Sequence, residues 1–105
     1  MAVTLIAVFE VPWEVVDRFL AEWNEDKDFM IRQPGFIDGT LYRSAQTDAH
    51  FRFVNVARWE REDDWRDALR AGYEERRERG IDRMADWQAR GITVTATVYD
   101  PALQY

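Results

Sequence analysis

The segment HFRFVNVARW, His50–Trp59, decides the fold. It is rich in β-branched and aromatic residues, and its side chains alternate with a period of two, which predicts a strand with two distinct faces. The more aromatic face, which we expect to look toward helices, carries Phe51, Phe53, Asn55, Ala57 and Trp59. The fold is therefore predicted to place one polar amide within an apolar layer.

Three further segments are predicted to be strands. Phe36–Ala45 precedes His50–Trp59 and is separated from it by the four residues QTDA. So short a connection favours an antiparallel hairpin. Ala2–Val11 and Ile92–Tyr99 are also rich in β-branched residues and are followed by prolines. Together the four segments predict a four-stranded sheet.

Two longer segments have helical periodicity. From Trp13, apolar residues recur with a period near 3.6 until Gln33-Pro34-Gly35, where proline and glycine end a helix. Glu60–Arg79 repeats the pattern, with an acidic first turn that suits the positive end of the helix dipole. Its last residues, EERRER at 74–79, alternate in charge and predict a solvated face. A short amphipathic segment, Ile81–Trp87, follows.

The order strand, helix, strand, strand, helix, strand predicts an α+β, ferredoxin-like fold. Both helices should cover one face of a four-stranded antiparallel sheet. The length of 105 residues fits a single domain over residues 1–105.

The other face of the sheet is also apolar. Thr4, Ile6 and Val8 alternate with the helix-facing side of the first strand, and Val54 and Val56 do so in the third. An apolar patch of this kind is seldom left exposed to water, so we expect it to pack on the sheet of an identical chain and form a homodimer. The alternative is that the Ile81–Trp87 segment covers it.

Composition excludes several classes of function. The 14 basic and 20 acidic residues give a net charge of −6, which disfavours nucleic acid as a partner. With no Cys and one His, His50, the chain lacks the residues for disulfides, thiol nucleophiles, iron–sulfur clusters and multi-His metal sites. The sequence has no 18-residue apolar run and no signal-peptide pattern, so we expect a cytoplasmic protein without membrane association.

Asn55 and Trp59 are the candidate chemical groups. Burying an amide without a partner costs about 1–3 kcal/mol, so Asn55 either bonds a backbone group or faces a cavity that holds water or ligand. Trp59 lies about 13 Å further along an ideal strand and also needs a partner for its indole N–H. It could equally close the end of a packed core.

Both helices offer aromatic walls for such a cavity. The candidate lining residues are Phe53 on the strand, Phe19, Trp23 and Met30 on the first helix, and Trp65, Leu69 and Tyr73 on the second. At helical spacing the same stripe is typical of ordinary core. Arg43 and Tyr42, on the second strand, are the nearest charge and phenol, and parity leaves open which of them faces a cavity. His50 should point to the opposite side of the sheet.

Four segments, in this order and spacing, resemble the antibiotic biosynthesis monooxygenase family of dimeric α/β barrels. They are FEVP at 9–12, QPGF at 33–36, LYRS at 41–44 and FRFVNVARWE at 51–60. The resemblance covers residues 3 to 75 closely and implies a ferredoxin-like subunit that pairs through its sheet. It also implies a pocket between each sheet and its own helices.

The resemblance further suggests roles for individual residues. Members that oxidise anthrone-type polyketides without metal or flavin carry Asn-x-x-x-Trp on the third strand, which Asn55 and Trp59 match. It thus implies that these two are catalytic and that no cofactor is required. A pocket Tyr of the following helix would fall near Trp65, where this chain departs from the pattern.

Haem-degrading relatives take their iron ligand from a His in or after the second helix, and this chain has no His beyond position 50. They also carry an Asn on the first strand, where Ala7 stands here. The resemblance therefore disfavours haem degradation.

The leading hypothesis is a cofactor-independent monooxygenase that oxidises a polycyclic aromatic, anthrone-like polyketide with dioxygen in secondary metabolism. Asn55 and Trp59 would stabilise an oxyanion, and the base could be an ordered water, the substrate's own phenolate or Arg43 acting on the substrate pKa. A non-redox polyketide cyclase or isomerase is the alternative. A small-molecule-binding dimer without chemistry is the third.

Overall fold

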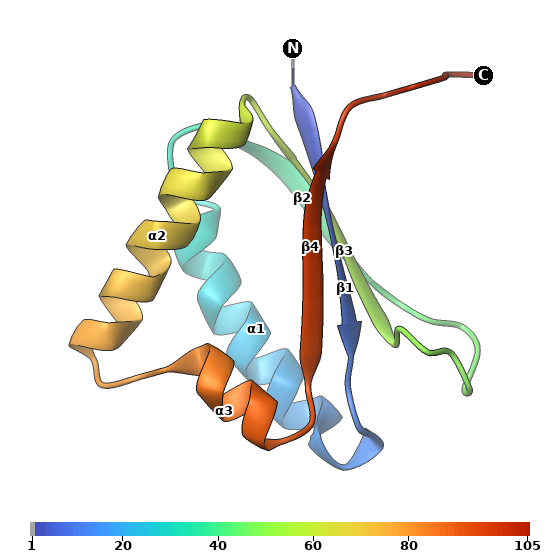
Figure 1. The fold of residues 1–105 in the computed structure, drawn as a ribbon, viewed down its shortest axis with the longest axis vertical. Helices are drawn as coiled ribbons and strands as arrows, with labels where there is room; N and C mark the ends of the chain where they lie inside the picture. Colours follow the sequence, from blue (N-terminus) through green and yellow to red (C-terminus); the bar gives the residue numbers. More distant parts are fainter. Residues whose placement is uncertain (1) are drawn as a thin grey trace.

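In the computed structural model, which describes residues 2–105, three helices pack on one face of a four-stranded antiparallel sheet (Figure 1). The elements are β1 Val3–Glu10, the 3-10 turn η1 Trp13–Val15, α1 Val16–Met30, β2 Phe36–Arg43, β3 Phe53–Trp59, α2 Glu62–Glu78, α3 Arg83–Ala89 and β4 Thr93–Tyr99. The strand order is β2-β3-β1-β4. This confirms the predicted ferredoxin-like fold.

The hairpin between β2 and β3 is longer than the sequence predicts. β2 ends at Arg43 and β3 begins at Phe53, because the residues between them form a loop. Arg52 holds this loop: its Nε donates to the Val11 carbonyl at 2.9 Å, and its guanidinium lies 3.6 Å from the centre of the Trp13 ring. Phe51 therefore lies in the loop, 40% exposed, and does not belong to the helix-facing row.

The register brings small and polar residues to the middle of the sheet. Asn55 on β3 pairs with Ala7 on β1 and with Leu41 on β2. One step further along β3, Ala57 pairs with Leu5 and with Gly39. This central part of the helix-facing surface therefore carries several short side chains.

A glycine sets the passage from α1 into β2. Gly35 has a φ of +89°, a conformation that glycine adopts without strain. A Cβ at this position would also collide with the side chain of Asp64 on α2. Gly35, at the predicted end of the first helix, thus also lies in close contact with the start of α2, just before β2 begins.

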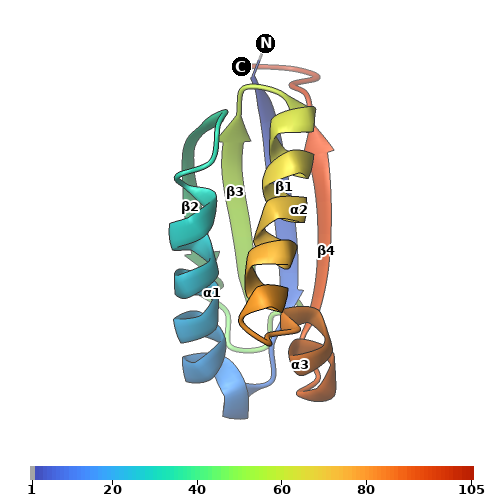
Figure 2. The same ribbon diagram turned by 90° about the vertical axis from the view of Figure 1, so that its left-hand side faces the viewer.

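All three helices lie on the same side of the sheet, as the turned view shows (Figure 2). The indole of Trp87 on α3 packs against Phe9 and Phe19, on the same face as α1. The alternative in which Ile81–Trp87 covers the second face is therefore wrong. No helix within residues 2–105 covers that face, where Tyr42 is 55% exposed and Ile6, Val8, Val54 and Val56 are half-buried.

Candidate functional site

A cavity of about 300 Å³ lies between the sheet and the helices. This volume is at the lower end of the range of about 300–1,000 Å³ for small-molecule sites. Most of its lining is apolar. The strands contribute Leu5, Ala7, Phe9, Phe36, Gly39, Leu41, Asn55, Ala57, Trp59 and Val94, and the helices contribute Trp23, Met30, Trp65, Leu69, Tyr73, Met84 and Trp87.

The cavity exists because large side chains on the helices face small ones on the sheet. Ala7, Gly39 and Ala57 form part of its floor and offer at most a methyl group each. Trp65 from α2 and Met30 from α1 form part of the opposite wall. The short floor residues leave space that these walls do not fill.

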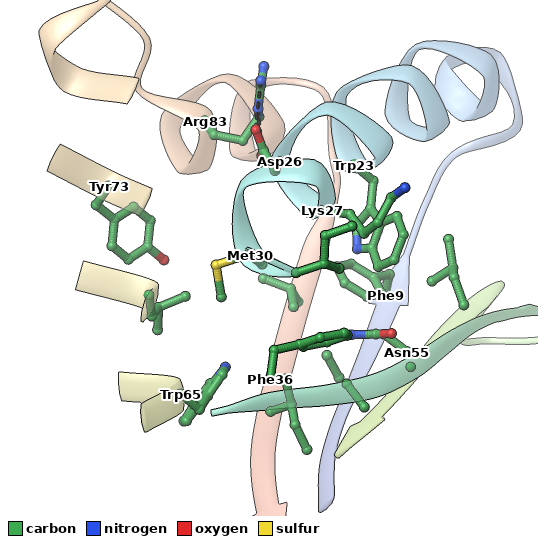
Figure 3. A pocket seen from close by; sticks show the side chains of 18 of the residues that line it. Phe9, Trp23, Asp26, Lys27, Met30, Phe36, Asn55, Trp65, Tyr73 and Arg83 are labelled. Carbon is green, nitrogen blue, oxygen red and sulfur yellow. Dashed lines mark hydrogen bonds and ion pairs between the residues drawn. The ribbon is translucent and has the colours of Figure 1, made fainter. Parts of the chain in front are cut away.

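Asn55 supplies a polar group to the apolar sheet side of this cavity. It lies below Phe9 and Trp23 in the close view, away from Asp26 and Arg83 (Figure 3). The side chain is half-buried, and no hydrogen bond to another of the described residues engages its amide. Asn55 therefore faces a cavity and is not bonded to a backbone group of the described residues. Its N–H groups are available to an oxygen of a bound molecule.

Trp59 forms the end of the same face and is 2% exposed. Its indole packs edge-on against Phe36, with ring centres 5.3 Å apart. The indole Nε1 is buried and has no hydrogen-bond partner within residues 2–105. Leaving a buried donor without a partner costs about 1–3 kcal/mol. Together with the Asn55 amide, this N–H is a second donor at the cavity without a partner among the described residues.

Five of the predicted wall residues line the cavity: Trp23, Met30, Trp65, Leu69 and Tyr73. Three other predicted residues do not. Phe19 and Phe53 are 0% and 1% exposed and belong to the closed core, and the Arg43 guanidinium lies 5.7 Å from the centre of the Phe53 ring. Arg43 is not among the described residues that line the cavity.

A closed aromatic cluster occupies the other half of the helix–sheet interface. Phe19 lies at its centre, with ring centres 5.1–5.2 Å from those of Phe9, Phe53 and Trp87. The rings meet in edge-on and tilted orientations, which aromatic pairs prefer over a face-to-face stack. This cluster packs α1 and α3 onto the sheet, and its members Phe9 and Trp87 also line the neighbouring cavity.

A network of charged side chains borders the helical end of the cavity. Glu22 accepts hydrogen bonds from Arg90 at 2.6 Å and from Arg83 and Trp87 at 3.0 Å each. Asp26 binds Arg83 through both oxygens, at 3.0 and 3.1 Å. Burial by itself raises the pKa of Glu22, but the hydrogen bonds from Arg90 and Trp87 and the attraction of Arg83 outweigh it and hold the pKa below its ordinary value.

Arg76 is one of several cavity residues that the sequence prediction missed. The run 74–79 was predicted to be solvated, yet Arg76 is 6% exposed and lines the cavity, so the prediction is wrong at this position. Its spacing contains the signal, because Trp65, Leu69, Gly72 and Arg76 follow one another at steps of three or four residues on α2. The prediction of a solvated face followed from the charged residues on both sides of Arg76.

Other charged groups lie away from the cavity. His50 is exposed, with its Nε2 3.5 Å from Glu10 on the loop side of the sheet. Arg58 forms a two-bond ion pair with Asp38 at 2.6 and 2.9 Å on the face without helices. The titratable residues lining the cavity are Asp26, Lys27, Tyr73, Arg76 and Arg83. Asp26 is already bound by Arg83, so the cavity holds no free carboxylate or imidazole to act as base.

Within residues 2–105 no group of three His, Cys, Asp or Glu side chains is placed to hold a metal ion. None of the helices formed by these residues is long and apolar enough to cross a membrane.

The fold and cavity are those of a ferredoxin-like subunit with a small-molecule pocket between its sheet and its helices. The family model described as "Antibiotic biosynthesis monooxygenase" matches residues 2–88. The chain belongs to this family, which confirms the resemblance found in its sequence. No curated protein matches the chain.

Solved structures show the same fold over nearly the whole chain. A candidate monooxygenase from Shewanella loihica PV-4 is 25% identical, with a TM-score of 0.81 over 98% of this chain and 96% of that one. SnoaB, a cofactor-independent oxygenase from Streptomyces nogalater, is 23% identical, with a TM-score of 0.64 over 98% and 95%. A variant of MhuD with two manganese protoporphyrin IX molecules bound per active site is 16% identical, with a TM-score of 0.66 over 98% and 97%.

Proposed function

We propose that this protein is a cofactor-independent monooxygenase that oxidises a polycyclic aromatic, anthrone-like substrate with dioxygen in secondary metabolism. The observation that carries the proposal is the unpartnered Asn55 amide on the apolar sheet side of the cavity. Family membership and the likeness to SnoaB, an oxygenase that needs no cofactor, support it. Such a site suits a reaction in which the substrate itself supplies the electrons.

The proposed reaction converts the CH₂ of an anthrone and one dioxygen into a C=O group and one water. The CH₂ first loses a proton to give a delocalised carbanion. The carbanion passes one electron to dioxygen, and the two radicals combine into a peroxide at the same carbon. Loss of the remaining C–H proton, with cleavage of the O–O bond, releases water and leaves the quinone. All four electrons that reduce dioxygen come from the CH₂ carbon of the substrate, which is oxidised to the carbonyl.

Asn55 stabilises the negative charge that develops in this sequence. Asn55 lines the cavity, where its amide N–H groups would donate to an enolate oxygen, and the surrounding apolar walls would strengthen that hydrogen bond. The Trp59 N–H is closed to solvent, so a substrate oxygen reaches it only after a shift of the ring. Trp59 therefore acts chiefly as a wall, and Asn55 is the principal donor.

The proton goes to a group that the protein does not provide. Among the described residues that line the cavity, Asp26 is the one carboxylate, and it is bound by Arg83; no imidazole lies among them. The anthrone is a phenolic carbon acid, and its own phenolate or a water molecule takes the proton. The protein contributes position, dryness and the hydrogen bond from Asn55.

Dioxygen consumption tests the proposal. Purified protein, dialysed against a metal chelator, is mixed with dithranol, a hydroxyanthrone added from an organic co-solvent, and oxygen uptake and quinone absorbance are followed together. The expected result is one dioxygen consumed per quinone, faster than the spontaneous reaction, with the acceleration lost in Asn55→Ala. Turnover of a polyketide substrate at the same rate under nitrogen would instead identify a non-redox cyclase or isomerase.

We also propose that two copies pair through the face of the sheet that carries no helix. Half-buried Ile6, Val8, Val54 and Val56 run across its centre, and the flanking Arg58 and Asp38 provide a polar rim. Sedimentation equilibrium is expected to give twice the chain mass of 12.5 kDa. A lysine at Val56 should convert the dimer to monomer, and a wild-type monomer at micromolar concentration contradicts the proposal.

A further inference from the structure

Arg76 is a buried cation without adequate compensation. Its side chain is 8% exposed, and its nearest carboxylate oxygen, on Asp26, lies 3.6 Å from a terminal nitrogen, beyond hydrogen-bond distance. Its Nε is buried and has no hydrogen-bond partner within residues 2–105. A charged group taken out of water in this way is costly unless it is paired.

The charged side chains of low exposure around Arg76 carry one more positive than negative charge. Three arginines of low exposure, Arg76, Arg83 and Arg90, face two carboxylates, Glu22 and Asp26. Asp26 gives both oxygens to Arg83, and Glu22 binds Arg83 and Arg90. Glu25 lies 4.0 Å from Arg83 but is paired with the more exposed Arg79 at 2.9 Å. Among the five groups of low exposure, three positive and two negative charges give a net charge of +1, and Arg76 is the member without a hydrogen-bonded partner within residues 2–105.

Arg76 also borders the cavity. The Tyr73 ring, whose centre lies 5.3 Å from the Arg76 guanidinium carbon, directs its hydroxyl into the cavity from the same helix (Figure 3). Asp26 and Arg83, which belong to the same charged network, lie across the cavity from Asn55 (Figure 3). The site therefore has an apolar middle, a neutral donor at the sheet and an uncompensated cation at the helices.

We infer that Arg76 forms an anion subsite, which binds a carboxylate or phenolate oxygen of an aromatic ligand whose rings fill the apolar middle of the cavity. This inference rests on the proposed function for the identity of the site and adds the charge of the substrate. An anionic group held at Arg76 orients the ring system so that its opposite edge meets Asn55. Arg76 is thus a positioning and specificity residue.

Binding of non-reacting quinones under nitrogen tests the subsite separately from oxygenation. The probes are anthraquinone-2-carboxylate and 2-(hydroxymethyl)anthraquinone, which share a ring system and differ in charge. Trp23, Trp59, Trp65 and Trp87 line the cavity, so quenching of tryptophan fluorescence reports binding. Wild type should bind the carboxylate about 10- to 100-fold more tightly than the alcohol, as a hydrogen-bonded charge pair requires.

Three variants test whether Arg76 causes the preference for the carboxylate probe. Arg76→Gln should abolish it while the alcohol still binds, and Arg76→Lys should retain part of it. Arg70→Gln removes a charge from the exposed face of the same helix and should retain all of it. 2-Hydroxyanthraquinone, titrated below and above the pKa of its phenol, tests the phenolate source in the same way.

Equal affinities of wild type for the charged and neutral probes, or failure to bind either, would overturn the inference. So would an unchanged preference in Arg76→Gln. If that variant does not fold, the wild-type comparison and Arg76→Lys decide. Oxygen uptake with a neutral anthrone does not depend on the subsite, so loss of the charge preference and loss of oxygenation are distinguishable failures.

Discussion

The two halves of the helix–sheet interface are built from the same kinds of residue but differ in packing. In the closed aromatic cluster, Phe19 meets three other rings and is 0% exposed. In the cavity, Trp65 and Met30 face the short side chains of Ala57 and Gly39 and enclose about 300 Å³. A high aromatic content therefore does not by itself make a pocket. The size of the residue on the opposite strand decides between core and site.

Removing the centre of the closed aromatic cluster should have the largest effect. We expect Phe19→Ala to lower the free energy of unfolding by about 3–5 kcal/mol, because the cavity it creates cannot collapse. Leu69→Ala, which enlarges a space that already exists, should cost less than about 2 kcal/mol. Urea unfolding of both variants measures the difference, and equal losses would contradict the distinction between the two regions.

Asn55→Ala should show the opposite balance between stability and activity. We expect kcat for anthrone oxidation to fall by about 100- to 1,000-fold, the usual loss when an oxyanion donor is removed. The free energy of unfolding should stay the same or rise, because the removed amide has no partner in the described structure. Activity that survives in Asn55→Ala would move the site elsewhere.

Glu22 joins the two regions, since it binds Trp87 of the closed aromatic cluster and Arg83 at the cavity. Glu22→Gln should lower the free energy of unfolding by about 2 kcal/mol at pH 7. The pKa of Glu22 is lower in the folded chain than its ordinary value of 4.5, so the carboxylate stabilises the fold above that pH and loses this effect as the pH falls through the lowered pKa. Unfolding curves of wild type and variant should therefore converge in acid, and a constant gap down to pH 2 contradicts this role.

A substitution that fills the cavity should give the smallest change in stability. Ala57→Leu extends into the cavity and should alter the free energy of unfolding by less than about 1 kcal/mol while weakening quinone binding at least tenfold. Ala68→Leu, at a buried position of α2 outside the cavity lining, should cost about 1–3 kcal/mol by overpacking. Tight quinone binding by Ala57→Leu would show that the cavity is not the binding site.

The sequence predicts the fold well because each strand and helix has its own periodicity. The alternation in β3 places Asn55, Ala57 and Trp59 on the helix-facing side, and the structure confirms these orientations. The prediction of β3 is wrong at its start, because the loop contact of Arg52 with Val11 is a long-range interaction. Such a contact leaves no trace in local periodicity.

The site is only partly predictable for a related reason. Periodicity identifies which residues face inward, but whether Phe19 meets another ring or empty space depends on the residue opposite it after the strands pair. Arg76 shows the same limit for charge, because a guanidinium in an alternating charged run is buried only through the approach of α1 and α3. These outcomes depend on tertiary contacts.

The most direct test of the account is a crystal structure of the protein with anthraquinone-2-carboxylate. The account predicts the rings between β3 and the two long helices, with a quinone oxygen within hydrogen-bond distance of the Asn55 amide and the carboxylate at Arg76. A ligand bound elsewhere, or a space between β3 and the helices closed by repacked side chains, would contradict it.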